Sequence, residues 1–189
     1  MRAGRRIWPL ISVLLVGGMA YAESLPADRL AKILLKSLTY DRNLKLRSEG
    51  GVRIGVVSLA SDAGSAGAGA ALLKEIQRFQ GKKVKGLPLS VEGLEVQEAS
   101  EVFRAVDEKK LNVLFLTPGC DPLLSKVVGL AKVKKVLIFS GDAKLAKAGA
   151  AIGISQQDGK PKITVNLSAA KEQGADLDDK LLKLAEVTK

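Results

Sequence analysis

The stretch that decides the fold lies near the end of the chain: Gly149-Ala-Ala-Ile-Gly-Ile-Ser-Gln-Gln-Asp-Gly-Lys-Pro-Lys-Ile-Thr-Val-Asn-Leu-Ser168. Its second half alternates apolar and polar residues, the pattern of a β-strand with one buried face. Asp158-Gly159 separates two such segments and favours a type I′ hairpin turn, because both central residues of that turn need a positive φ. The stretch therefore predicts an antiparallel β-hairpin over 150–167. The residues expected on its buried face are Ile163, Val165 and Leu167.

A closing helix is predicted after the hairpin. Asp176 can cap its first turn, where Asp178 and Asp179 would interact favourably with the helix dipole. The spacing of the apolar residues that follow gives this helix one buried face. They are Leu177, Leu181, Leu182 and Ala185.

The same region carries a family resemblance. The order of a small, glycine-containing hairpin, then I-x-V-N-L-x-A-A-K, then L-x-x-K-L-L-K-L-A-x-V resembles the closing signature of the YfiR/HmsC-like family. These are small exported bacterial proteins associated with control of membrane-bound diguanylate cyclases. The signature residues in this chain are Ile163, Val165, Asn166, Leu167, Ala169, Ala170, Lys171 and 177–187. Asn166 is interpreted as structural, its amide holding the strand-to-helix turn that Ser168 begins.

The beginning of the chain predicts export. Arg2, Arg5 and Arg6 precede a short apolar run, and Ala20-Tyr21-Ala22 fits the small-x-small rule for signal-peptide cleavage. A retained N-terminal anchor is the alternative, although the apolar run is short for a membrane span. We expect a signal peptide over 1–22, cleavage after Ala22 and a single periplasmic domain over 23–189 that does not span the membrane.

The composition of the chain disfavours several classes of function. Removing residues 1–22 takes away three arginines and no acids, so the formal charge falls from +10 to +7, which suits an acidic partner or anionic head groups as well as simple solubility. Few aromatic residues remain for base stacking, which disfavours nucleic acid. The chain has no histidine, which excludes Ser-His and Cys-His catalysis. Cys120 is the only cysteine, so no intrachain disulfide is possible, unlike in several expected relatives.

Between the two ends, apolar strands alternate with amphipathic helices. This order predicts an α/β fold: a three-layer sandwich around a mainly parallel sheet, closed by the hairpin and the final helix. The polar run 40–43 after the first helix fits either a helix end or a recognition surface. An edge strand is expected at 83–91, because Gly86 and Pro88 interrupt it; pairing of this edge with a second copy would give a homodimer. The other expected strands are 52–59, 112–117 and 135–140.

Two regions of the sequence could bind a ligand. Gly64, Gly67 and Gly69 are expected in a turn before a helix, where backbone N–H groups can hold an anion; the spacing matches neither a dinucleotide fingerprint nor a P-loop, so close packing is the alternative. The second place is the rim formed by the carboxyl ends of the parallel strands. Helix capping and a small-ligand or cation site both fit its residues. They are Ser61, Asp62, Thr117, Asp121, Ser140 and Asp142.

The leading expectation is a non-enzymatic periplasmic regulator. The resemblance implies that it binds the periplasmic part of an inner-membrane diguanylate cyclase or sensor and restrains it, so that cyclic-di-GMP synthesis and biofilm formation respond to envelope conditions. The alternative is a small-ligand or cation binding module, accessory to a transporter or a sensor kinase. An enzyme is not expected, and neither is a cofactor or a bound metal. Cys120 lies in the loop that follows the expected strand 112–117. Its thiol is either reactive or an inert side chain packed in the interior.

Overall fold

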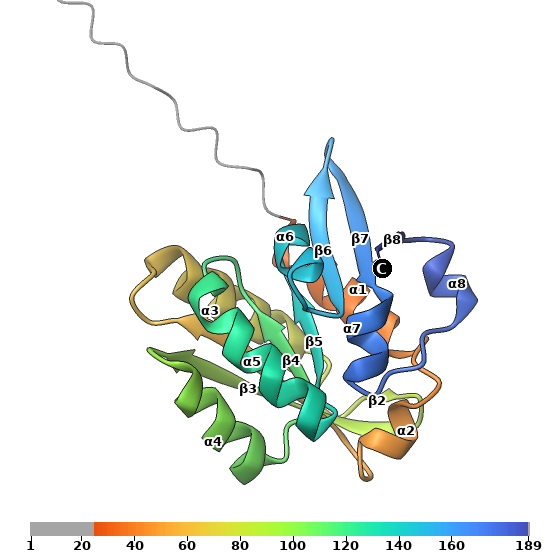
Figure 1. The fold of residues 1–189 in the computed structure, drawn as a ribbon, viewed down its shortest axis with the longest axis horizontal. Helices are drawn as coiled ribbons and strands as arrows, with labels where there is room; N and C mark the ends of the chain where they lie inside the picture. Colours follow the sequence, from red (N-terminus) through yellow and green to blue (C-terminus); the bar gives the residue numbers. More distant parts are fainter. Residues whose placement is uncertain (1–24, 189) are drawn as a thin grey trace, which may run out of the picture.

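A computed structural model describes residues 25–188, so the expected signal peptide and its cleavage site lie outside the described residues. The fold is built on one eight-stranded sheet with the order β2-β3-β1-β4-β5-β6-β7-β8 (Figure 1). Neighbouring strands from β3 to β6 run parallel, whereas β2 and β3, and β6 and β7, pair antiparallel. The strands are β1 (Val52–Leu59), β2 (Lys83–Val84), β3 (Leu87–Val96), β4 (Val113–Leu116), β5 (Leu137–Ser140), β6 (Ile152–Gln157), β7 (Lys160–Asn166) and β8 (Glu186–Thr188).

Helices cover both faces of the sheet, so the predicted three-layer α/β fold is confirmed. Figure 1 shows α4 and α5 side by side in front of the sheet and α1 behind it. The main helices are α1 (Ala27–Leu38), α3 (Ala63–Gln77), α4 (Ala99–Lys109) and α5 (Asp121–Lys134). Shorter helices complete the chain: α2 (Leu44–Arg47), α6 (Ala143–Lys147), α7 (Leu167–Glu172) and α8 (Asp179–Leu182).

Each central strand buries residues on both faces, as expected of a parallel sheet covered by helices. In β4, Val113 and Phe115 pack into the core beneath α1 and α3, whereas Leu114 and Leu116 pack into the core beneath α4 and α5. All four side chains are at most 1% exposed. The two cores hold the sheet between its helical layers.

The C-terminal region departs from the sequence expectation in detail. The hairpin is present, with φ of 50° at Asp158 and 72° at Gly159, as its turn requires. Leu167 is not on the strand, because β7 ends at Asn166 and Leu167 begins α7. The closing helix α8 has only four residues, and Asp178 caps it, not Asp176. Its successor β8 pairs parallel with β7, which the sequence did not predict.

The physical reason is that Asp176 is already bonded elsewhere. Its N–H donates to the carboxylate of Asp41, and its carbonyl accepts the N–H of Arg42. These bonds tie residue 176 to the turn after α1, so the helix cannot begin until the chain has left that turn.

Two further expectations need correction. The glycines at 64, 67 and 69 are not in a turn, because α3 begins at Ala63 and contains all three. A Cβ on Gly69 would lie 3.0 Å from the Cβ of Ser58, so the glycine permits close packing of α3 on β1. The expected edge strand over 83–91 is instead the β2–β3 hairpin, turning at Lys85-Gly86; β2 forms the edge, and β3 pairs with β1 along eight residues.

Candidate functional site

Two of the six residues of the predicted rim at the carboxyl ends of the strands, Asp62 and Asp142, are helix caps. An Asp62 carboxylate oxygen accepts the N–H of Ser65 at 3.0 Å and caps α3. Asp142 accepts the N–H of Lys144 at 2.8 Å and caps α6, while the hydroxyl of Ser140 accepts the N–H of Asp142 at 3.0 Å. Each bond spans two or three residues, so these side chains are satisfied locally.

Thr117 and Cys120 belong to a buried polar cluster behind the rim. The Thr117 hydroxyl lies 3.1 Å from the carbonyl of Val57 and 2.7 Å from the hydroxyl of Ser65, which in turn accepts the N–H of Leu59. The thiol of Cys120 is fully buried, 3.5 Å from the same Val57 carbonyl. The cluster therefore joins β1 and α3 to the loop between β4 and α5, and the thiol is out of reach of solvent.

The remaining rim residues, Ser61 and Asp121, lie at the surface. Ser61 is exposed, and Asp121 is exposed in the first turn of α5, where the helix dipole favours a carboxylate. In residues 25–188, no group of three or more His, Cys, Asp or Glu side chains is arranged to hold a metal ion. Asp62, Asp121 and Asp142 thus do not form a metal-binding cluster of three carboxylates.

A cavity of about 180 Å³ lies beside this rim, but its lining is mainly apolar. Thr117 is the only rim residue that contributes to it. Apolar surface comes from Leu25 before α1 and from one residue each of α1, α3 and β4: Leu30, Ala68 and Phe115. Such a lining offers apolar contact and few polar groups to orient a ligand.

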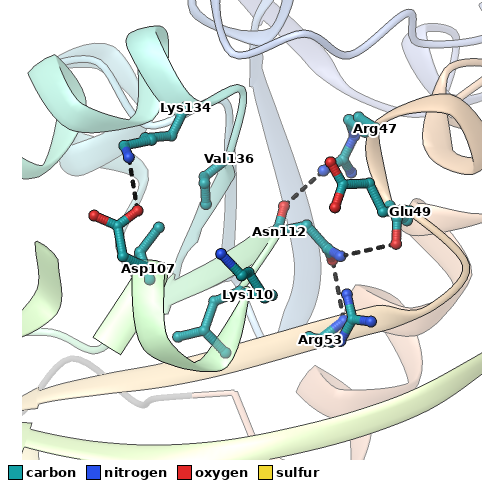
Figure 2. A pocket seen from close by; sticks show the side chains of 11 residues that line it. Arg47, Glu49, Arg53, Asp107, Lys110, Asn112, Lys134 and Val136 are labelled. Atoms are coloured by element: carbon teal, nitrogen blue, oxygen red, sulfur yellow. Dashed lines mark hydrogen bonds and ion pairs between the residues drawn. The ribbon is translucent and has the colours of Figure 1, made fainter. Parts of the chain in front are cut away.

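A second cavity, of about 220 Å³, lies at the opposite, amino ends of β1, β4 and β5. Its lining is polar and mostly basic. Figure 2 shows Asn112 between Arg47 and Arg53 on one side and the ion pair of Lys134 with Asp107 on the other. The four cationic side chains in the lining are Arg47, Arg53, Lys110 and Lys134, and the two acidic ones are Glu49 and Asp107.

A buried ion pair underlies this second cavity. Nε of Arg47 lies 2.7 Å from the carboxylate of Asp41, and the two side chains are 4% and 0% exposed. The carboxylate of Asp41 also accepts the N–H groups of Asn43 and Asp176. Burial lowers the pKa of the Arg47 guanidinium, while the charge of Asp41 and its hydrogen bond oppose that shift. Asp41 is therefore an interior anchor, and of the run 40–43 it is the residue furthest from solvent.

Asn112 completes the network. Its side-chain oxygen accepts the N–H of Arg53 at 3.0 Å, its amide nitrogen donates to the carbonyl of Gly51 at 2.7 Å, and its backbone carbonyl accepts Nη1 of Arg47 at 2.6 Å. One side chain thus fastens the loop before β1 to the start of β4. Neither Arg47 nor Asn112 was a candidate from the sequence, because the bonds that Asn112 makes with Arg47, Arg53 and Gly51 span 59 or more residues.

The side chain of the signature residue Asn166 makes two hydrogen bonds to backbone groups, as the side chain of Asn112 does. Its side-chain oxygen accepts the N–H of Ala169 and caps α7, while its amide nitrogen donates to the carbonyl of Ala146. Val165 is buried in the core and Ile163 packs against it.

Comparison with protein families places this network within a known fold. A family model described as YfiR/HmsC-like matches residues 39–186, which include Asp41, Arg47, Asn112 and Asn166. The chain belongs to the YfiR/HmsC-like family. This family consists of periplasmic regulators associated with control of cyclic-di-GMP synthesis. The search of curated proteins found no match to this YfiR/HmsC-like chain.

Solved structures share the fold at low sequence identity. A conserved domain protein from Vibrio cholerae O1 biovar El Tor is 16% identical with a TM-score of 0.60, over 87% of this chain and 60% of that one. An ABC domain from Streptococcus pneumoniae, in complex with L-Trp, is 14% identical with a TM-score of 0.59, over 86% and 60%. A ligand-free substrate-binding protein from Clostridium difficile, CD0873, is 16% identical with a TM-score of 0.52, over 82% and 59%.

These likenesses concern the fold alone. The YfiR/HmsC-like chain spans about 60% of the length of the solved proteins that it matches. None of the helices between residues 25 and 188 has the length and apolarity needed to cross a bilayer.

Proposed function

We propose that the mature chain is a non-enzymatic periplasmic regulator that binds the periplasmic part of an inner-membrane diguanylate cyclase or sensor and restrains it. Membership of the YfiR/HmsC-like family is the observation that carries this proposal. The lack of histidine in the sequence supports it, because the common nucleophile–imidazole systems cannot be built. The rim residues support it further, since local capping accounts for Asp62 and Asp142.

The regulator acts through unequal affinity for two conformations of its partner. A bound protein shifts such an equilibrium only by the difference between its binding free energies to the two states. We propose that this chain binds the less active conformation more tightly. Cyclic-di-GMP synthesis, and with it biofilm formation, then rises when envelope conditions weaken the complex.

A direct binding experiment tests this function. The mature protein, residues 23–189, is mixed with the purified periplasmic domain of an inner-membrane diguanylate cyclase from the same organism, and complex formation is followed by calorimetry and by size-exclusion chromatography with light scattering. A saturable heterocomplex is expected. Absence of a complex with that domain contradicts the proposal, and the light-scattering mass of the free protein also decides whether it is a homodimer.

Export is part of the same proposal. Cell fractionation should place the protein in the periplasm, and N-terminal sequencing of the mature form should begin at Glu23. A cytoplasmic protein that still carries residues 1–22 would contradict both the location and the choice of partner.

A second candidate function is a small-ligand binding module, accessory to a transporter or a sensor kinase. The observation that favours it is the cavity of about 180 Å³ at the carboxyl ends of the strands, the usual ligand position in open α/β sheets. Its lining favours an apolar ligand. A panel of envelope metabolites should then raise the melting temperature, and a bulky substitution in the cavity, Ala68→Leu, should abolish that rise. Loss of the rise in Asp62, Asp121 or Asp142 variants would instead place the ligand on the polar rim.

A further inference from the structure

The exposed side of α1 carries two shallow apolar grooves. One, of about 310 Å³, is lined by Ile33 and Tyr40 together with residues of the C-terminal region, including the strongly exposed Leu184. The other, of about 260 Å³, is lined by Leu35 and Thr39 together with residues around the β2–β3 hairpin. Lys32 and Lys36 line both grooves, so they form the ridge between them.

Helical spacing explains this arrangement. Residues four apart lie one above the other on a helix, which places Lys32 and Lys36 in one row along α1. Ile33 and Tyr40 follow on one side of that row, and Leu35 and Thr39 on the other. A ridge between two grooves is the geometry with which one helix receives another at an interaxial distance of about 8–10 Å.

The rims of the grooves are positively charged. Lys82 and Lys83 line the second groove beside Lys32 and Lys36, and neither groove has an acidic residue in its lining. We call these four lysines and the two grooves the lysine face. Lys32 pairs with Asp28 at 3.3 Å, in an ion pair whose side chains are 64% and 47% exposed.

The other three lysines of the lysine face have no acidic partner within residues 25–188. Nζ of Lys36 lies 5.4 Å from the centre of the Tyr40 ring, and Nζ of Lys82 lies 5.3 Å from that of Phe79. The aliphatic stems of Lys36 and Lys82 therefore cover apolar surface, while their charges remain available to a partner.

We propose that the lysine face binds an amphipathic, acidic α-helix of the periplasmic partner. Apolar side chains of that helix enter the grooves on either side of the Lys32–Lys36 ridge, and its carboxylates pair with the lysines. The inference rests on the proposed function, and it identifies both the surface used and the chemistry of the segment that binds there. Charge complementarity selects this occupant over a second copy of the chain, because a two-fold contact would place lysine against lysine.

Charge reversal tests the surface. Lys36→Glu/Lys82→Glu changes two lysines that have no ion-pair partner and removes only their contacts with the Tyr40 and Phe79 rings, so circular dichroism should stay as in the wild type and the melting temperature should fall by no more than about a few degrees. Calorimetric affinity for the cyclase's periplasmic domain should fall on the order of tenfold or more, since like charges then face each other. The matched control is Lys126→Glu/Lys144→Glu, the same charge change at exposed positions on α5 and α6; its affinity should stay within about twofold.

Two further measurements separate the alternatives. Leu184→Gln removes exposed apolar surface from the first groove and should weaken binding by about threefold or more without destabilising the fold. Vesicles containing phosphatidylglycerol should not bind the wild-type protein; vesicle binding that the lysine variant abolishes would assign the face to a membrane surface and overturn the inference.

The experiments distinguish failure of the lysine face from failure of the proposed function. A complex that forms with wild-type affinity despite the charge reversal overturns the lysine face alone and leaves the proposed function standing. Absence of any complex with the wild-type protein overturns the proposed function, and the lysine face falls with it.

Discussion

The two ends of the sheet hold polar residues in different ways. At the carboxyl ends, Asp62 and Asp142 accept backbone N–H groups two or three residues away. At the amino ends, Asp41 and Asn112 bond to groups as many as 135 and 65 residues away in the chain. The first arrangement starts helices, whereas the second closes the fold by joining distant segments. Polarity at the end of a strand is therefore a weak sign of a ligand site.

The largest expected effect concerns the buried ion pair. Arg47→Ala leaves the carboxylate of Asp41 without its cation in a fully buried position, and should lower the free energy of unfolding by about 3–5 kcal/mol. Urea denaturation followed by circular dichroism measures this change. Replacing both partners, Asp41→Leu/Arg47→Met, should cost less than the sum of the two single changes. A loss below about 1 kcal/mol for Arg47→Ala would mean that the pair does not close the amino end.

Asn112→Ala should have the next largest effect. The change leaves the N–H of Arg53 and the carbonyl of Gly51 without their partner at the start of β1, which costs about 2–3 kcal/mol. The same denaturation experiment measures it. Asn166→Ala is the matched control, because that side chain also makes two backbone contacts but one of them is only a helix cap. An equal loss in the two variants would remove the distinction between long-range and local bonds.

The cap variants should be milder. Asp62→Ala removes the side-chain cap of the fifteen-residue α3 and should cost about 1 kcal/mol. Asp142→Ala should cost no more, since α6 has only five residues. If either change instead cost as much as Arg47→Ala, the rim would be part of a cooperative network and not a set of independent caps.

The sequence predicted those features that depend on near neighbours. Strand β1 occupies the predicted range 52–59, and the hairpin turns at Asp158-Gly159. Periodicity and turn chemistry determine such elements within a few residues. The amino-end network escaped prediction because Arg47 and Asn112 carry no local signal for partners so far away in the chain.

Tertiary packing overrode local preference in two other places. The glycines of α3 suggested a turn, but contact with Ser58 makes Gly69 suitable for a helix packed on β1. The closing helix was shortened because residue 176 bonds to the turn at Asp41 and Arg42. Of the candidate site, the positions of the rim residues followed from the alternation of strands and helices, whereas the apolar lining of the adjoining cavity did not.

The smallest expected effect is the acid sensitivity of exposed carboxylates. Bonds to Lys180 and Arg42 lower the pKa of Asp178, the backbone N–H of Lys180 contributing most, and bonds to Lys162 and Lys147 lower the pKa of Glu186. A carboxyl with a lowered pKa in the folded state stabilises the protein above its unfolded pKa, and that stabilisation disappears as pH falls through the folded value. The melting temperature should therefore decline below about pH 4.5, the ordinary value for Glu.

Added salt should distinguish the contributions of Asp178 and Glu186 to acid-dependent stability. Added salt screens the ion pairs of Glu186 with Lys162 and Lys147, but affects the backbone hydrogen bond of Asp178 much less. Asp178→Asn should therefore reduce the part of the acid-dependent decline that persists at high salt, and Glu186→Gln the part that salt removes. Equal effects of the two variants at high salt would contradict this assignment.

Cellular cyclic-di-GMP tests the central claim most directly. Its concentration should rise when the gene is deleted and return to the wild-type level when the full-length chain is supplied and exported. A form without residues 1–22 should fail to restore it, because the proposed partner domain is periplasmic. An unchanged concentration after deletion, or restoration by the form that is not exported, would contradict the account.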